Sequence, residues 1–179
     1  MDVYINKNEK IVEWNVGEKV ITIHNEHVLY AWLHGKNMLM IREGYEASED
    51  GISTYDKEGN LIFSFKFYEN RITFKEMDIT EINGAIISAD YEEEKRKLVV
   101  LKEAEEISSL LIYDEKGDLL AEIKSPRGYT FVSLKNYAGN IMVTAQGTND
   151  TTRDPFGRND WNFVIDFDFF SVQKKSITQ

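Results

Sequence analysis

The sequence has no cysteine, and only two of its 179 residues are proline. Without cysteine the chain can form no disulfide bond and offers no thiolate to a metal, so we expect a cytoplasmic protein. It has no run of 18 apolar residues and no basic segment leading into an apolar one at its start, so neither a membrane span nor a signal peptide is expected. It also lacks a Gly/Ser-rich linker, which predicts a single domain over residues 1–179.

Basic residues are fewer than acidic ones. The 21 lysines and arginines face 31 aspartates and glutamates, which gives a formal net charge of −10. This charge disfavours binding to nucleic acid and to anionic membranes. It permits a basic protein as partner.

Catalytic signatures are missing as well. There is no Gly-x-Ser-x-Gly, no Walker-type loop and no Gly-x-Gly-x-x-Gly, which disfavours the common hydrolase and nucleotide-binding folds. His24, His27 and His34 lie close together, but on a strand the first two would point to opposite faces. We therefore predict no cofactor, no metal site and no catalytic residue.

What the sequence does contain is an internal repeat. Residues 55–62 (YDKEGNLI) match residues 113–120 (YDEKGDLL) at an offset of 58, and both lie between runs rich in branched and aromatic residues. The aspartate can accept hydrogen bonds from the backbone that follows it, and the glycine can adopt the left-handed conformation that closes a short loop. Each copy therefore predicts a β-hairpin.

Further strands align with this repeat. Three segments match on Ala31, Ala89 and Ala145, spaced by 58 and 56 residues, and strand-like runs precede and follow each of them. Residues 3–14 resemble the same hairpin without its glycine, which suggests that the chain begins late in a repeat unit. The sequence thus predicts an all-β protein of about twelve antiparallel strands in three repeats of about 57 residues.

The order of these strands resembles the blades of β-propellers of the NHL and WD-repeat kind, in which the last hairpin often carries Asp-x-x-Gly. The resemblance implies a propeller-like arrangement, although three units are fewer than closed propellers usually have. A β-trefoil, with three units of four strands, is the alternative. The charged segments 91–97 and 102–106 are interpreted as hairpin tips.

The long polar loop 148–161 has three interpretations. It could bind a partner, because arginine and tryptophan are enriched at binding hot spots; it could supply oxygen ligands to calcium; or it could be a structural turn around 154–157. The first interpretation concerns Arg153, Arg158 and Trp161, and the second concerns Asp150, Asp154, Asn159 and Asp160.

Two other loops, 43–50 and 102–106, occupy corresponding places in successive units, and both are acidic. If they emerge at the same end of the domain, they form a negative rim that would steer a basic partner. Alternatively, they keep a β-rich protein soluble. The rim would consist of Glu43, Tyr45, Glu46, Glu49, Asp50, Glu103, Glu105 and Glu106.

The stretch 157–166 (GRNDWNFVID) resembles a carboxyl-terminal motif of small bacterial β-repeat proteins, several of which are candidate immunity partners of toxins. The resemblance implies a non-enzymatic module that binds and neutralises a basic toxin or nuclease. A second hypothesis is a small-ligand-binding protein or hydrolase that uses carboxylates such as Asp90, Asp114 or Asp166. A third is a structural module that forms oligomers.

Overall fold

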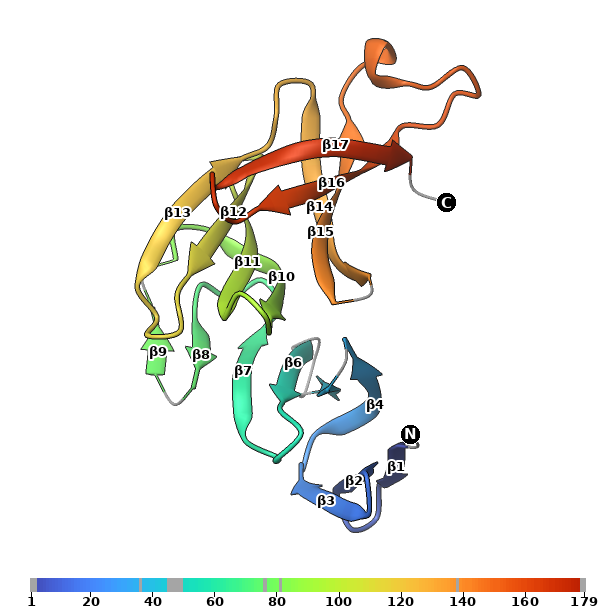
Figure 1. Ribbon diagram of the computed structural model, residues 1–179, viewed down its shortest axis with the longest axis vertical. Coiled ribbons are helices and arrows are strands. Elements are labelled where there is room, and N and C mark those ends of the chain that lie inside the picture. Colours follow the sequence, from blue (N-terminus) through green and yellow to red (C-terminus); the bar gives the residue numbers. More distant parts are fainter. Residues whose placement is uncertain are drawn as a thin grey trace. The chain divides into compact units, whose positions relative to one another are not determined.

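The protein is all-β, as the sequence predicts. The computed structural model describes residues 3–35, 37–44, 50–75, 77–80, 82–137 and 139–177. These residues form seventeen strands and one short 3₁₀ turn, without an α-helix and therefore without a helix that could span a membrane. Every strand pairing is antiparallel, and each of the four sheets is made of consecutive strands (Figure 1). The chain divides into two compact units, unit 1 (Met1–Glu81) and unit 2 (Ile82–Gln179).

Unit 1 contains two sheets, which we call sheets A and B. Sheet A consists of β1 (Val3–Asn6), β2 (Ile11–Val16) and β3 (Lys19–His24). Sheet B consists of β4 (Val28–His34), β5 (Met38–Gly44), β6 (Asp50–Tyr55), β7 (Leu61–Lys66), β8 (Ile72–Phe74) and β9 (Met77–Ile79).

The core of unit 1 comes from alternate positions on strands of both sheets. Val12 and Trp14 of β2 are buried together with Leu39 and Ile41 of β5. In each pair the two residues are separated by one position, so their side chains point to the same face of the strand. The apolar faces of sheets A and B therefore pack together.

Unit 2 contains two four-stranded sheets, C and D. Sheet C consists of β10 (Ala85–Glu92), β11 (Lys97–Ala104), β12 (Ile107–Tyr113) and β13 (Leu119–Lys124). Sheet D consists of β14 (Tyr129–Tyr137), β15 (Asn140–Gly147), β16 (Asp160–Asp166) and β17 (Ser171–Ile177), with the 3₁₀ turn η2 (Asp150–Thr152) between β15 and β16.

The core of unit 2 lies between these two sheets. In sheet C, Val99 is paired with Ile112 in the register of neighbouring strands, and in sheet D Val143 is paired with Phe163. All four side chains belong to one buried cluster. Cross-strand pairs of branched and aromatic residues of this kind are a main source of sheet stability.

A β-bulge marks the first hairpin of sheets B, C and D. Leu29, Ile87 and Val132 are each skipped in the pairing of their strand with the next one. Ala31, Ala89 and Leu134 lie two positions after these bulges, on the first strand of sheets B, C and D. Ala145 lies on β15, the second strand of sheet D, so its alignment with Ala31 and Ala89 is wrong by one strand. The strand-like run that precedes the Ala145 segment, residues 129–131, is the beginning of the nine-residue strand β14. The described residues form five strands more than the predicted twelve, and the hairpin expected over residues 3–14 is present as β1 and β2.

The two Asp-x-x-Gly segments form the predicted hairpin turns. Asp56 Oδ1 accepts hydrogen bonds from the backbone N–H groups of Glu58 and Asn60, both at 2.9 Å, and Gly59 has a φ of +91°. Asp114 makes the equivalent bonds in the β12–β13 turn, where Gly117 has a φ of 82°. A carboxylate that binds the turn backbone and a left-handed glycine thus close both loops.

Candidate partner-binding loop and acid-lined cleft

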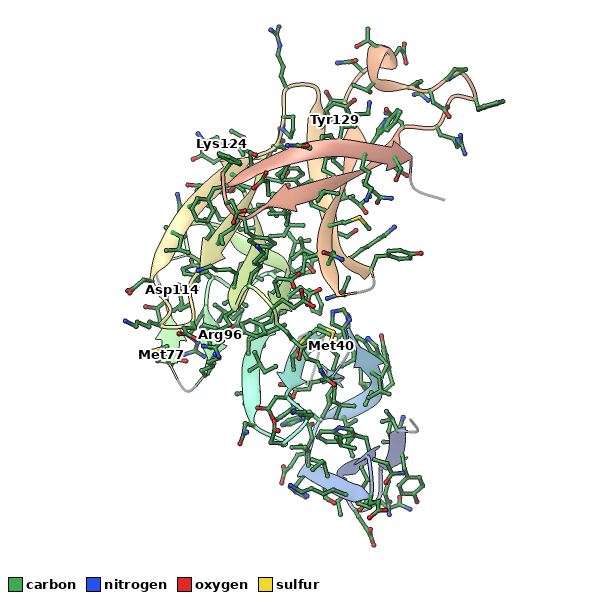
Figure 2. All side chains as sticks on the ribbon, viewed as in Figure 1. Met40, Met77, Arg96, Asp114, Lys124 and Tyr129 are labelled. Atoms are coloured by element: carbon green, nitrogen blue, oxygen red, sulfur yellow. The ribbon has the colours of Figure 1, made fainter. Side chains whose placement is uncertain are left out.

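The strands of unit 2 end in two groups of connections. Figure 2 shows Lys124 and Tyr129 toward one end of this unit and Arg96 and Asp114 toward the other. We call the first end the loop end; it comprises residues 103–108, 125–128 and 148–161. We call the second the turn end; it comprises the described residues of the β10–β11, β12–β13, β14–β15 and β16–β17 turns.

The loop 148–159 is held at its base by a polar network. Asn159 donates from Nδ2 to the carbonyl of Gly147 at 2.6 Å, and the Gly147 N–H donates to the carbonyl of Asn159 at 2.9 Å. Thr152 Oγ1 lies 2.7 Å from Asn159 Oδ1 and 2.6 Å from the carbonyl of Asn149. The base of the loop therefore has one defined backbone path.

The tip of the loop is a third Asp-x-x-Gly turn. Asp154 Oδ1 accepts from the N–H groups of Phe156 at 2.9 Å and Arg158 at 2.8 Å, and Gly157 has a φ of +79°. Although desolvation opposes the effect, these backbone bonds and the Arg158 guanidinium lower the pKa of Asp154. The structural interpretation of 154–157 as a turn is correct, and the turn repeats the geometry found at Asp56 and Asp114.

This tip holds a large apolar side chain in solvent. Phe156 is 83% exposed, and the Arg158 guanidinium carbon lies 5.4 Å from the centre of its ring. Arg153 pairs with Asp150 at 3.0 Å and Arg158 pairs with Asp154 at 2.8 Å, so both arginines support the loop while half of each side chain stays exposed. An aromatic residue on a preorganised loop has the properties of a binding anchor.

Trp161 is partly buried and connects the loop to its own sheet. Its Nε1 donates to the carbonyl of Thr152 at 2.8 Å, and Lys174 Nζ lies 3.2 Å from the centre of its ring. The same lysine donates to Tyr129 Oη at 2.6 Å, which ties strand β17 to the beginning of β14. Trp161 thus fixes the end of the loop to sheet D.

A second element of the loop end is the β11–β12 turn. It consists of Glu105 and Glu106, which are exposed and have φ values of 52° and 65°. Two-residue hairpin turns with two positive φ angles strongly favour asparagine and glycine. Two glutamates here carry backbone strain, and with the exposed Glu103 they make this turn acidic.

In unit 1, the first residue of the predicted acidic rim is buried and not exposed. Glu43 is only 7% exposed, and its Oε1 accepts hydrogen bonds from Asn25 at 2.7 Å and from Ser53 at 2.6 Å. Glu43 is therefore part of a buried polar cluster and does not belong to an exposed rim. Asp50 pairs with Arg42. The other three predicted residues, Tyr45, Glu46 and Glu49, lie outside the described residues.

An acid-lined cleft of about 310 Å³ lies at the turn end of unit 2, between sheets C and D. Lys95 of the β10–β11 turn approaches Asp168 of the β16–β17 turn at 3.8 Å. Apolar side chains from β15 and β16 form part of its wall. The polar side chains that line it are Glu92, Glu94, Lys95, Asn140, Asp166, Asp168 and Gln173.

Glu92 is the most buried of these acids, at 5% exposure. Its Oε2 accepts a hydrogen bond from the Ile141 N–H at 3.3 Å. Desolvation raises the pKa of Glu92, and the hydrogen bond from Ile141 only partly opposes this effect. A carboxyl group of this kind in a cleft is suited to proton transfer or to binding a cation.

The three carboxylates suggested for an active site all accept backbone hydrogen bonds. Asp114 accepts the backbone bonds of its turn, and the largest cause of its lowered pKa is the hydrogen bond from the Asp118 N–H. Asp166 Oδ1 accepts from the N–H groups of Asp168 and Phe169 at 3.0 Å each, although Asp166 also lines the cleft. Asp90 is buried and accepts from the Tyr91 N–H at 2.7 Å.

In the part of the chain that the structure describes, no group of three or more acidic or histidine side chains is placed to hold a metal ion. Three of the four side chains proposed as calcium ligands in the loop have other partners. Asp154 accepts from two backbone N–H groups, Asn159 Oδ1 faces Thr152, and Asp150 pairs with Arg153. These side chains build the loop.

Sequence reasoning missed two residues. Phe156 lies within the turn segment we identified, and its signal was a large apolar residue between proline and glycine, where neither strand periodicity nor a core position accounts for it. Glu92 was interpreted as part of a charged hairpin tip. Glu92 is the last residue of β10, and its side chain accepts a hydrogen bond from the Ile141 N–H at the beginning of β15. This contact between distant segments accounts for its burial.

No protein-family model matches the chain, and comparison with curated proteins finds no match.

Proposed function

We propose that this chain is a non-enzymatic protein-binding module that engages a basic partner through the loop end of unit 2. The observation that carries the proposal is Phe156, 83% exposed at the tip of a loop fixed by Asp154, Asn159 and Thr152. Because the loop is already ordered, binding would cost little further conformational entropy. The ring can therefore act as an apolar anchor.

The charge of the loop end selects the kind of partner. Glu103, Glu105 and Glu106 form an acidic turn, and with the three aspartates of the loop they give the loop end six acidic residues against three arginines. An excess of acidic residues at the same end as an apolar anchor favours a positively charged partner and accelerates its association at low salt. The strained pair Glu105–Glu106 supports a functional role, because strain of this kind is concentrated at functional sites.

The more specific proposal is an immunity-type inhibitor of a basic toxin or nuclease. It is supported by the resemblance of residues 157–166 to the motif of small bacterial immunity-type proteins. The mechanism is steric occlusion: the loop end covers the partner's active surface, and the acidic turn accelerates the encounter. No catalytic group of this chain is required.

The decisive experiment is affinity capture from the source cell, followed by kinetics with the captured protein. We expect Phe156→Ala to weaken binding at least about tenfold, as loss of an aromatic hot spot does. The matched control is Phe169→Ala, because Phe169 is 81% exposed but lies at the turn end. Equal binding of both variants and the unchanged protein would overturn the proposal.

The electrostatic part has a test of its own. Glu105→Lys combined with Glu106→Lys should lower the association rate at low salt and reduce its dependence on ionic strength. Exchanging two other exposed acids, Glu94→Lys with Glu115→Lys at the turn end, should change the rate less. An unchanged rate in the first variant would remove the acidic turn from the mechanism.

A second candidate function is binding or hydrolysis of a small ligand in the acid-lined cleft. The observation that favours it is Glu92, a buried carboxyl with a raised pKa beside about 310 Å³ of open volume. Thermal-shift screening of small cationic and carbohydrate compounds would test it. Hits that stabilise the unchanged protein but not Glu92→Ala would support this function, and an absence of such hits would count against it.

The finer architecture is also a proposal. We infer that β4–β7, β10–β13 and β14–β17 are three blade-like repeat units, with β1–β3 the remainder of a fourth. The bulge shared by the first hairpins of sheets B, C and D supports this inference, as do the Asx-capped hairpins at Asp56, Asp114 and Asp166. A propeller-like arrangement is favoured over a trefoil, because each unit is a simple four-stranded meander.

A further inference from the structure

Sheet A of unit 1 ends in a strand that is paired on one side only. The β1–β2 hairpin turns as the β16–β17 hairpin does: Asn6 Oδ1 accepts from the N–H groups of Asn8 and Glu9, and the last turn residue, Lys10, has a φ of 59°. In the β16–β17 turn, Asp166 and Phe170 have these roles. However, β16 is paired with strands on both sides, whereas β1 is paired with β2 alone.

Edge strands usually carry features that prevent pairing with another chain, such as charged residues or bulges. In the described part of the chain, β3, β9, β10, β13, β14 and β17 each contain a charged residue, and β4 contains the bulge at Leu29. Strand β1, with the sequence Val-Tyr-Ile-Asn, has neither. It is the one unprotected edge among the described strands.

The side chains of β1 fit a copy of the same strand. Val3 and Ile5 face the core of unit 1, while Tyr4 between them is 60% exposed. A two-fold axis through Tyr4 makes the pairing antiparallel and places Val3 opposite Ile5 of the second copy. Because opposite residues share a face of the sheet, the apolar positions then stay on one side and the two tyrosines meet on the other.

This register also continues the apolar rows of sheet A. Within one chain Val3 is paired with Trp14, which is paired with Ile21, and Ile5 is paired with Val12, which is paired with Ile23. Pairing Val3 with Ile5 of the second copy joins the two rows end to end. A shift by one residue would place core-facing residues opposite exposed ones.

We infer that the free edge of β1 is a self-association site at which a second copy of this chain adds its own β1, giving a two-fold symmetric, six-stranded sheet. The inference is independent of the proposed partner at the loop end, since it concerns unit 1 alone. The interface is isologous, so one contact closes the dimer and leaves no further β1 edge.

The absence of cysteine allows a direct test by cross-linking. In an antiparallel pair, residues directly opposite have Cα atoms about 4.5–5.5 Å apart, which a disulfide can bridge. Tyr4→Cys should therefore form a covalent dimer under mild oxidation. The matched control is Val20→Cys, because Val20 is 56% exposed on the other edge strand, β3, and should cross-link at least about tenfold more slowly.

Sedimentation equilibrium supplies the second measurement. The unchanged protein should show a concentration-dependent monomer–dimer equilibrium, and Tyr4→Lys should shift it to monomer, because two like charges would face each other across the axis. Val20→Lys should leave it unchanged. A monomer at all concentrations, or equal cross-linking of both cysteine variants, would overturn the inference while leaving the loop-end proposal untouched.

Discussion

The two ends of unit 2 use polar side chains in opposite ways. At the loop end, Asp154, Asn159 and Thr152 bind the backbone and hold Phe156 outward in solvent. At the turn end, Glu92 is buried between two sheets beside an open cleft. The first end is built to present a surface and the second to surround a small group. This difference explains why we assign partner binding to the loop end.

The largest expected effect comes from the base of the loop. In Gly147→Val, the new Cβ would clash with Thr152 Oγ1 and Asn159 Oδ1, both of which are anchored to the backbone by hydrogen bonds. We expect a loss of about 2–4 kcal/mol in the free energy of unfolding, because the loop base cannot relax without breaking its network. Urea denaturation followed by tryptophan fluorescence measures it.

Gly157 at the loop tip provides the comparison. A Cβ there meets no atom within 4 Å, and only the positive φ opposes it. Gly157→Ala should therefore cost about 1 kcal/mol. If both substitutions cost the same, the base of the loop is not the rigid element on which Phe156 depends.

A smaller effect, of opposite sign, is expected at the acidic turn. Glu106→Gly should increase the free energy of unfolding by about 0.5–1 kcal/mol, because glycine adopts the φ of 65° without strain. The same substitution should weaken binding of a basic partner. Glu103→Gly is the control, since Glu103 lies inside strand β11 and glycine there should destabilise. A destabilised Glu106→Gly would contradict the assignment of strain.

The fold could largely be predicted from local signals. The Asp-x-x-Gly turns at Asp56 and Asp114 were identified correctly, because a carboxylate and a left-handed glycine determine such a turn within five residues. The third copy at Asp154 was identified only as a turn, since no strand-like run leads directly into it. The alignment of Ala145 failed because one small residue cannot distinguish the first strand of a meander from the second.

The candidate site was less predictable, because it depends on contacts between distant segments. Glu43 begins a segment with the composition of an exposed acidic loop, yet hydrogen bonds from Asn25 and Ser53 hold its side chain inside unit 1. Glu92 is buried by its position next to Ile141, 49 residues further along the chain. Arg153 and Arg158 were correctly placed in the loop, but their ion pairs with Asp150 and Asp154 follow from the two turns. Hydrophobic patterns do not contain this information.

The smallest effect is expected at the turn end and depends on pH. The pKa of Glu92 is raised in the folded protein above its ordinary value of 4.5, so above this pH the folded state binds more protons than the unfolded state. The contribution of Glu92 to stability is then present at low pH and is lost as the pH rises through the raised pKa. Glu92→Gln cannot ionise and should avoid this loss.

The measurement is the difference in free energy of unfolding between Glu92→Gln and the unchanged protein, determined by urea denaturation between pH 4 and 8. This difference should grow in favour of the variant as the pH rises through the raised pKa of Glu92, and it should then level off. Other carboxyls such as Asp114 titrate equally in both proteins, so their contributions cancel in the difference. Glu93→Gln, one residue further and outside the cleft lining, is the matched variant measured beside it. A difference independent of pH would mean that the cleft does not perturb Glu92, and the contrast between the two ends would then rest on the loop alone.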